Sequence, residues 1–420
     1  MKNYLPRLIE KEIEKQMKAM GCVVIEGPKW CGKSTTGERF AKTIVKLQKK
    51  EVLKKYQTFA TTDSSLLFEG VRPIMFDEWG LLPELWDYIR VEVDESGKRG
   101  EFILTGSAKP LEDSKRHSGI GRIVKIRMRP LSLWESKDST GQVSLKDLFA
   151  GCRKVTANCK LGLRDIAFII CRGGFPETIG EEMETALTLS QNYFKALVED
   201  DITDIDDIKR NPERARKIIQ SYARNISSTA TNKTLKDDIT SSDETLDEKT
   251  LSSYTNALRK MYVIEDVVAW SPKLRSKTTI RASAKRQFAD PSIATAALGA
   301  TPNDLINDLN TFGFLFESLC IRDLRIYAEA LGGTVYHYQD NGGLEADAIV
   351  HLANGDWGAI EIKLGANEIE EGAANLITLK KRVDEKKMKE PKFLMILTGL
   401  DYGYTRPDGV HVVPIGCLRD

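Results

Sequence analysis

The stretch Gly27-Pro28-Lys29-Trp30-Cys31-Gly32-Lys33-Ser34-Thr35 decides the fold of the first part of this 420-residue chain. Two glycines bracket four residues and are followed by a lysine and a hydroxyl residue, which is the spacing of a phosphate-binding loop. In such a loop the backbone N–H groups surround a phosphate chain, Lys33 reaches the β and γ phosphates, and Ser34 is a ligand of Mg²⁺. The alternative is a glycine-rich turn that happens to precede a helix.

The residues on either side place this loop between a strand and a helix. Cys22-Val23-Val24-Ile25 is a short apolar run typical of a buried parallel strand. Residues 35–49 predict a helix with Phe40, Ile44 and Leu47 on one face. A strand, a glycine loop and a helix together aim N–H groups at a phosphate chain. The context therefore favours nucleotide binding over an accidental turn.

The next motif is Pro73-Ile74-Met75-Phe76-Asp77-Glu78, an apolar run that ends in two adjacent carboxylates. A buried parallel strand that stops here places both acids at the carboxyl edge of the sheet, where α/β proteins bind ligands. Asp77 would hold the hydration shell of Mg²⁺, and Glu78 would orient or deprotonate the attacking water. The two motifs together predict a protein that binds ATP with Mg²⁺ and hydrolyses ATP.

Later strands of the predicted sheet carry further polar candidates. Residues 101–107 predict a strand ending in Thr105 and Ser107, hydroxyl residues that can sense the γ-phosphate or position water. A simple turn that closes the strand is the alternative for either one. Arg122 opens the strand 123–127 and is a candidate arginine finger toward a neighbouring subunit's γ-phosphate. A surface arginine is the simpler interpretation, whereas a shared site predicts a homo-oligomer.

Composition limits the class of protein. A hydrophobic content of 41% and a charged content of 29% are typical of soluble globular proteins, and the length predicts roughly two to four domains. The net charge of +1 excludes a large overall field. Seven cysteines without a C-x-x-C pair, beside four scattered histidines, argue against a zinc site or a disulfide framework. No apolar run approaches the ~20 residues of a membrane span, so we expect a cytoplasmic protein without a membrane partner.

The motifs, taken in order, resemble a known family. The glycine loop is followed by Phe76-Asp77-Glu78, Ile103-Leu104-Thr105-Gly106-Ser107, Gly121-Arg122, and Pro130-Leu131-Ser132 with Glu135. This series is similar to that of the AAA-type ATPases of bacteria and archaea that carry an uncharacterised C-terminal domain, and the resemblance covers nearly the whole chain. One departure is Lys29-Trp30-Cys31, where Arg-Gln and a small aliphatic residue are expected. Phosphate binding should survive this change, because the loop acts through its backbone.

The resemblance also concerns a turn in the middle of the chain. Related ATPases pack a Gly-x-Pro turn against the adenine, and the turn 172–177 of this chain contains Pro176. The resemblance therefore implies that Pro176 contacts the base. A helix terminator needs the same glycine and proline residues and is the alternative.

Segment 213–296 predicts a winged helix. Three helices, 214–225, 234–239 and 247–262, precede a strand and a wing. The wing carries six basic residues and no acid: Lys273, Arg275, Lys277, Arg281, Lys285 and Arg286. Such a local basic patch favours contact with DNA. Many winged helices instead bind protein partners or link domains, so both interpretations stay open.

The last segment resembles the PD-(D/E)XK nuclease fold. A helix from residue 312 and strands at 334–339, 345–352 and 357–363 are followed by a helix at 367–383 and further strands. The residues of a nuclease site would be Glu317, Asp347, Glu361 and Lys363.

The spacing of two of these residues has a structural meaning. Glu361 and Lys363 leave the same face of one strand because they are two residues apart. Two carboxylates can hold Mg²⁺ while the lysine polarises water beside a scissile phosphate. A proline is expected before Asp347, but Ala346 stands there. The alternative is a surface salt bridge between Glu361 and Lys363.

We therefore predict an α/β multidomain protein with a P-loop parallel sheet, a helical lid, a winged helix and a C-terminal α/β nuclease-like domain. The segments are 1–20 (lead-in helix), 21–137 (ATPase core), 138–212 (lid), 213–296 (winged helix) and 297–420 (nuclease-like domain). The first functional hypothesis is a Mg²⁺-dependent ATPase whose winged helix and C-terminal domain act on DNA. The alternative is a nucleotide-gated switch that binds a protein partner and whose nuclease-like domain does not cut. A small-molecule kinase is disfavoured because two further domains follow and no acceptor-binding insertion is evident.

Overall fold

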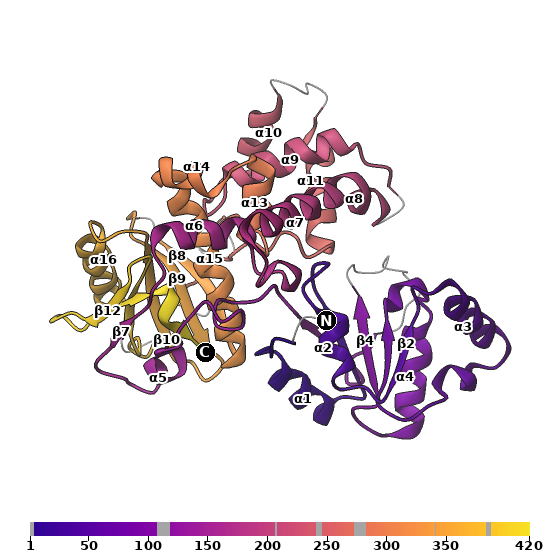
Figure 1. Ribbon diagram of the computed structural model, residues 1–420. Helices are drawn as coiled ribbons and strands as arrows, with labels where there is room; N and C mark the ends of the chain where they lie inside the picture. Colours follow the sequence, from indigo (N-terminus) through magenta and orange to yellow (C-terminus); the bar gives the residue numbers. More distant parts are fainter. Residues whose placement is uncertain are drawn as a thin grey trace. The chain divides into compact units, whose positions relative to one another are not determined.

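The computed structural model describes residues 4–106, 118–205, 208–240, 246–272, 283–340, 342–383 and 388–420 (Figure 1). The chain forms two compact units. The first unit comprises Met1–Pro130, Thr203–Lys209 and Ala257–Val263. The second unit comprises Leu131–Ile202, Arg210–Asn256 and Ile264–Asp420. Each unit has its own sheet.

The first unit is built on a five-stranded sheet in the order β2-β3-β4-β1-β5. All neighbouring strands are parallel. The strands are β1 (Cys22–Glu26), β2 (Thr43–Lys46), β3 (Ile74–Asp77), β4 (Phe102–Gly106) and β5 (Ile123–Arg127). The strands β1, β3 and β4 are buried along their whole length, which explains their continuous apolar sequences. The predicted P-loop-type parallel sheet is confirmed.

Helices cover both faces of this sheet. Alternate residues of β1 point to opposite sides and so belong to two different cores. Cys22 and Val24 pack in one core with residues of α3 (Lys50–Thr62) and α4 (Leu85–Ser96). Val23 and Ile25 pack in the other core with residues of α1 (Glu10–Ala19). Figure 1 shows these helices on the two sides of the sheet. The remaining elements are α2 (Lys33–Glu38), η1 (Ser64–Phe68) and η2 (Trp79–Leu81).

The helix predicted for residues 35–49 is wrong. The helix α2 ends at Glu38, and residues 43–46 form β2 at the edge of the sheet. Thr43, Ile44 and Val45 are β-branched, and such residues favour a strand. The helical spacing of Phe40, Ile44 and Leu47 was therefore coincidental. As a consequence, the carboxyl end of β2 lies beside Asp77, with Lys46 paired with that residue.

The second unit contains a seven-stranded mixed sheet in the order β7-β12-β13-β11-β10-β9-β8. The strands β8, β9 and β10 pair antiparallel, and β10, β11 and β13 pair parallel. Helix α15 (Leu309–Ala330) packs against β8 and β9, and α16 (Ile369–Arg382) packs against β10 and β11. The predicted order of helix, three strands, helix and strand is therefore present. The strands are β7 (Thr156–Asn158), β8 (Gly333–Gln339), β9 (Glu345–Leu352), β10 (Trp357–Lys363), β11 (Leu394–Thr398), β12 (Tyr402–Thr405) and β13 (His411–Pro414).

The segment predicted as a helical lid is only partly helical. Strand β7 belongs to the edge of the seven-stranded sheet, and β6 (Val143–Ser144) pairs with β14 (Leu418–Arg419). The described helices of the chain's middle part come after β6 in the sequence. They are α5 (Leu145–Phe149), α6 (Leu163–Arg172), α7 (Met183–Ala196), α8 (Ile202–Asp204), α9 (Pro212–Arg224), α10 (Asn232–Thr240), α11 (Glu248–Lys260), α13 (Pro291–Leu298) and α14 (Pro302–Asn307).

The predicted winged-helix segment contains the expected helices as α9, α10 and α11, close to the predicted positions. The strand expected after them is reduced to isolated bridges, in which Ile264 pairs with Phe288 and Val267 with Lys285. Lys285 and Arg286, which we had assigned to an exposed basic wing, are buried. That part of the prediction is wrong, because both cations are held by carboxylates. The other wing residues, Lys273, Arg275, Lys277 and Arg281, lie outside the described residues, and the winged helix stays a prediction.

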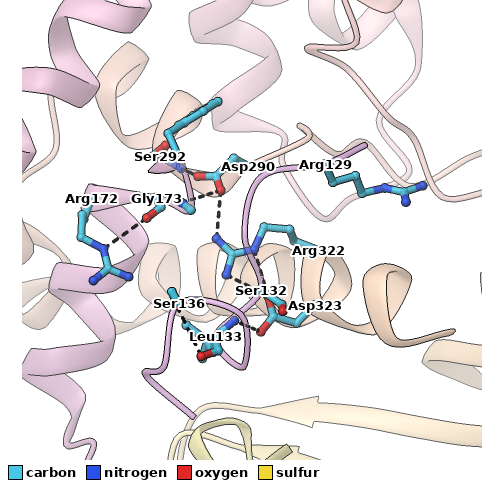
Figure 2. Close-up of polar contacts among 12 residues, drawn as sticks. Arg129, Ser132, Leu133, Ser136, Arg172, Gly173, Asp290, Ser292, Arg322 and Asp323 are labelled. Carbon is cyan, nitrogen blue, oxygen red and sulfur yellow. Dashed lines mark hydrogen bonds and ion pairs between the residues drawn. The ribbon is translucent and has the colours of Figure 1, made fainter. Parts of the chain in front are cut away.

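A buried ion cluster joins α15 to the middle of the second unit (Figure 2). The guanidinium of Arg322 donates to Asp290 at 2.9 Å and to Asp323 at 2.7 Å. Asp290 also accepts from the amide of Gly174 at 2.9 Å, and Asp323 accepts from the amide of Leu133 at 2.8 Å. All three charged side chains are almost completely buried. The cluster therefore satisfies backbone groups of the turn after α6 as well as its own charges.

Two predictions from composition concern the chain as a whole. In the part of the chain that the structure describes, no helix has both the length and the apolar character that crossing a membrane requires. All seven cysteines are free thiols, and five of them are buried. The cytoplasmic location stays a prediction.

Candidate functional sites

The loop between β1 and α2 is shaped by its glycines. Gly32 has a φ of 97°, a left-handed conformation that favours glycine. A Cβ at Gly27 would lie 2.1 Å from the carbonyl oxygen of Met128, so any side chain there would clash. Trp30 is 44% exposed and Cys31 is buried. The side chains of Trp30 and Cys31 therefore lie in solvent and in the core, and the inside of the loop is formed by the backbone.

The amine of Lys33 lies within the loop. Its Nζ donates to the carbonyl oxygens of Gly27 at 3.0 Å and Pro28 at 2.7 Å. From the lead-in segment, the guanidinium of Arg7 donates to the carbonyl of Cys31 at 2.7 Å and so supports the loop from outside. The positive charge of Lys33 is thus placed where a phosphate chain enters such a loop.

Asp77 at the end of β3 is surrounded by neutral donors. Its Oδ1 accepts from the hydroxyls of Ser34 and Thr105, each at 2.6 Å. Its Oδ2 accepts from the side-chain nitrogen Nε2 of Gln48 at 2.9 Å. The sheet register explains these contacts, because Asp77 pairs with Thr105 on the neighbouring strand β4. The loop, the acid strand and the predicted sensor residue therefore meet at one edge of the sheet.

The donor set fits a magnesium–nucleotide complex. Mg²⁺ is usually bound through one or two protein oxygens together with phosphate oxygens and water, and Ser34 and Asp77 supply such oxygens. Glu78 follows directly with a φ of 55°, a left-handed conformation at the start of η2. Ser107, the other sensor candidate, lies outside the described residues.

A second carboxylate site lies in the second unit, where α15, β9 and β10 meet. The register pairs Ile360 with Ala348 in antiparallel strands, which places Glu361 opposite Asp347. Lys363 Nζ lies 3.0 Å from Glu361 Oε2, and this glutamate is buried. The alternative of a surface salt bridge is therefore wrong in one respect, because the pair forms but its carboxylate is in the interior.

The predicted nuclease-site residues are joined by a cation that sequence reasoning did not assign to them. Lys285 Nζ lies 3.0 Å from Glu317 Oε1 and 3.0 Å from Asp347 Oδ1. The other oxygen of Asp347 accepts from the amide of Ile362 at 2.9 Å. Lys285 precedes its partners by 32 and 62 residues. No local pattern in the sequence indicates contacts at such separations.

The charges of this cluster shift one another's pKa values. Burial, together with the charge of Asp347, raises the pKa of Glu317 to about 8 and that of Glu361 to about 8. Burial alone would lower the pKa of Lys285, but Asp347 and Glu317 outweigh it and raise that pKa. Burial alone would raise the pKa of Asp347, but Lys285 and Lys363 outweigh it and lower that pKa. Asp347 and both lysines are therefore charged at neutral pH.

The cluster opens onto a cavity of about 670 Å³ in the second unit. Glu317, Asp347 and Lys363 line it together with apolar residues such as Leu309 and Phe314. The cavity is large enough for a ligand of small-molecule size. However, among the residues that the structure describes, no group of three or more histidine, cysteine, aspartate or glutamate side chains is arranged to hold a metal ion.

The first unit contains a segment that is similar to a known protein family. Residues 20–137 match the AAA domain family. We call residues 20–137 the AAA domain after this match. Two later segments match families described as domains of unknown function, DUF8612 over residues 163–304 and DUF4143 over residues 312–418.

One comparison with a solved structure adds nothing to this assignment. A Walker-type ATPase of Pyrococcus abyssi is 14% identical, covers 70% of this chain and 96% of its own, and has a TM-score of 0.43. A likeness at this level carries no argument about fold or function. No curated protein shows significant similarity to the chain.

Gln48 is the residue of the AAA domain that sequence reasoning missed. It follows β2, and its side chain reaches Asp77 because β2 and β3 are neighbours. The signal was the β-branched run 43–45, which indicates a strand and so brings the residues after it to the same sheet edge. The erroneous helix over 35–49 concealed this signal.

Two predicted residues have local roles apart from the nucleotide loop. Arg122 donates to Asp94 at 2.6 Å. It precedes Ile123, which pairs with Cys22 at the start of β1, so it lies at the sheet end opposite the loop. Pro176 begins η3 (Pro176–Thr178) in the second unit, after Gly173 ends α6. Their roles as arginine finger and adenine contact stay predictions.

Proposed function

We propose that the AAA domain binds ATP with Mg²⁺ and hydrolyses it. The observation that carries the proposal is Asp77 Oδ1, which accepts from Ser34 of the loop and from Thr105 of β4 at 2.6 Å each. One carboxylate oxygen thus links the phosphate-binding loop to the strand tip beside it. When Mg²⁺ is bound, it neutralises charge on the β and γ phosphate oxygens.

Each residue of the site has a proposed part in turnover. The loop amides and the amine of Lys33 bind the phosphates, and Ser34 and Asp77 hold the magnesium ion and its water. Glu78 accepts a proton from the attacking water or orients that water. Thr105 holds Asp77 in place and senses the γ-phosphate. The backbone and these side chains are positioned by rigid strands, which is what electrostatic stabilisation of a transition state requires.

Steady-state ATP turnover and equilibrium binding of ATP test this proposal. Glu78→Gln removes the base but keeps the shape, so kcat should fall by about 10²–10⁴-fold while ATP still binds. Lys33→Ala removes a charge from the phosphates, so binding itself should weaken by about 10²-fold or more. Lys29→Ala, in the same loop, is the matched control and should change either quantity by less than about threefold. Hydrolysis by Glu78→Gln at the parent rate would refute the assigned role.

We further propose that Arg122 acts on the ATP site of a second copy of the chain. Its position at the far end of the sheet excludes a role in its own site, so the finger hypothesis requires a homo-oligomer. Mixing the inactive variants Glu78→Gln and Arg122→Ala should then restore part of the activity, because some interfaces combine one intact Glu78 with one intact Arg122. Full activity of Arg122→Ala alone would contradict this role.

We propose a second function, for the C-terminal part of the chain. This part has a nuclease-like arrangement, binds DNA or a protein partner, and does not cut DNA in the described conformation. Asp347 beside Glu361 and Lys363 supports the nuclease-like arrangement. The amine of Lys285 on Glu317 and Asp347 favours the non-cutting version, which makes the protein a nucleotide-gated switch. The C-terminal part would then report the nucleotide state to its partner.

Incubation with single-stranded, double-stranded and branched DNA, with ATP and either Mg²⁺ or Mn²⁺, tests this second function. Cleavage that is lost in Asp347→Ala and Lys363→Ala would show a cutting nuclease and contradict it. Salt-dependent DNA retention that falls when Lys273, Arg275 and Lys277 are neutralised would identify DNA as the partner. No cleavage, together with no salt-dependent DNA retention that is lost on neutralising these residues, favours a protein partner.

A further inference from the structure

We propose that the ammonium group of Lys285 occupies the place of a divalent cation between Glu317 and Asp347, and that it thereby closes this site to Mg²⁺. The inference rests on the proposed nuclease-like arrangement, but it concerns metal binding and not cleavage. Lys285 lies outside the predicted nuclease motif, yet its ammonium group decides whether the motif can bind a metal ion.

The geometry of Lys285 is that of a bridging cation. One nitrogen lies 3.0 Å from a carboxylate oxygen of Glu317 and 3.0 Å from one of Asp347. Magnesium would bind such oxygens at about 2.0–2.1 Å, in the same space between the two side chains. The amine and the ion therefore exclude each other by volume and by charge.

The backbone fixes the position of this amine. The N–H of Lys285 donates to the carbonyl of Val267 at 2.9 Å, and its carbonyl accepts from the N–H of Val267 at 2.9 Å. This two-bond bridge anchors the start of a side chain that is only 9% exposed. Removing a cation from such a setting leaves the buried carboxylate of Asp347 without compensation. Lys285 is thus a built part of the site and not a surface lysine resting against it.

The other carboxylate oxygens of the cluster that could bind a metal ion also have partners. Asp347 Oδ2 accepts from the amide of Ile362, and Glu361 is paired with Lys363. Both oxygens of the central carboxylate are therefore in use, one with an ammonium and one with a backbone N–H. The cavity beside the cluster still leads to Glu317 and Asp347. Access for a ligand is open, and only the cation position is filled.

Binding of Mn²⁺ to the full-length, nucleotide-free protein, measured by electron paramagnetic resonance, tests the inference. The wild type should show no Mn²⁺ that depends on Asp347, judged against Asp347→Asn. Lys285→Met keeps the length of the side chain and removes its charge. It should gain one Asp347-dependent Mn²⁺ per chain, because the ammonium group that fills the cation position is removed.

Three further variants control the experiment. Lys389→Ala removes an exposed lysine that pairs with Asp356 at 2.8 Å in the same unit, and should gain no such ion. Lys285→Arg keeps a cation and should stay metal-free. If Lys285→Met does not fold, Lys285→Met combined with Glu317→Gln removes one of the two buried acids and keeps Asp347 for the ion. Circular dichroism establishes folding in each case.

The outcomes separate this inference from the proposed function. Asp347-dependent Mn²⁺ in the wild type would overturn the inference, and this arm holds even if no Lys285 variant folds. Folded Lys285→Met without a new ion would also overturn it. A Lys285→Met protein that binds Mn²⁺ but never cuts DNA would count against the nuclease-like proposal alone, and would leave the role of Lys285 standing.

Discussion

Each unit of this protein has a candidate site that combines an aspartate on a β-strand with a lysine, yet the two sites are built in opposite ways. Asp77 accepts hydrogen bonds from two hydroxyls and an amide, all of them neutral. Asp347 accepts from an ammonium and from a backbone N–H. The first carboxylate keeps its negative charge for an incoming cation, and the second has that charge cancelled within the chain.

The difference teaches that a motif of acids and lysines does not identify a metal site by itself. Neutral donors orient a carboxylate without reducing its attraction for Mg²⁺, whereas an ammonium at 3.0 Å competes directly with the ion. The lysine of the first site, Lys33, donates to loop carbonyls instead of to Asp77. The partner of the carboxylate, and not the carboxylate, distinguishes the two sites.

The largest expected effect is on the free energy of unfolding, when a buried cation that holds carboxylates in the interior is removed. Arg322 forms ion pairs with Asp290 and Asp323 in the interior, as Lys285 does with Glu317 and Asp347. Arg322→Met should lower the free energy of unfolding by about 3–5 kcal/mol, because two buried carboxylates lose their partner. Chemical denaturation measures the change. Lys389→Ala breaks an exposed pair and should cost less than about 1 kcal/mol. Equal losses in the two variants would break the comparison.

The second effect contrasts the two aspartates directly. Asp77→Asn should lower Mg²⁺-dependent ATP turnover by about 10²–10³-fold, because the charge that faces the magnesium ion is lost. Asp347→Asn is the matched change in the other unit and should leave turnover within about twofold of the parent. Steady-state ATPase assays of both proteins at one Mg²⁺ concentration decide the point. A large loss of turnover in Asp347→Asn would show that the two sites are not independent.

The smallest effect tests the neutral donors around Asp77. Thr105→Val keeps the shape of the side chain but removes one hydrogen bond to a charged group, a loss of about 1.5–3 kcal/mol or roughly 10–100-fold in turnover. Thr378→Val, on the exposed side of α16, removes a hydroxyl that bonds only a helix carbonyl and should leave turnover unchanged. Parent-like turnover of Thr105→Val would mean that Asp77 does not need this donor.

Local spacing explains which parts were predictable from the sequence. The glycine loop, the acid strand and the strand that ends in Thr105 depend on neighbouring residues, and their sheet was foreseen correctly. The element 35–49 was not, because three apolar positions matched helical spacing by coincidence while the β-branched run at 43–45 indicated a strand. The misassigned strand in turn concealed Gln48.

The contacts of Lys285 could not be foreseen for a different reason. Its partners are separated from it by 32 and 62 residues, and only the folded chain brings them together. From the sequence it was one cation in a basic run, and such runs are usually solvated. In the fold it is buried on two acids. The residue types of the C-terminal site were predictable, but the group that controls their charge was not.

The number of Mn²⁺ ions bound per chain in the presence of a slowly hydrolysed ATP analogue tests the central claim most directly. The account predicts one ion, which is lost in Lys33→Ala together with the nucleotide and is retained in Asp347→Asn. A second ion that disappears in Asp347→Asn would contradict it, because the carboxylate neutralised by Lys285 would then be a cation site after all.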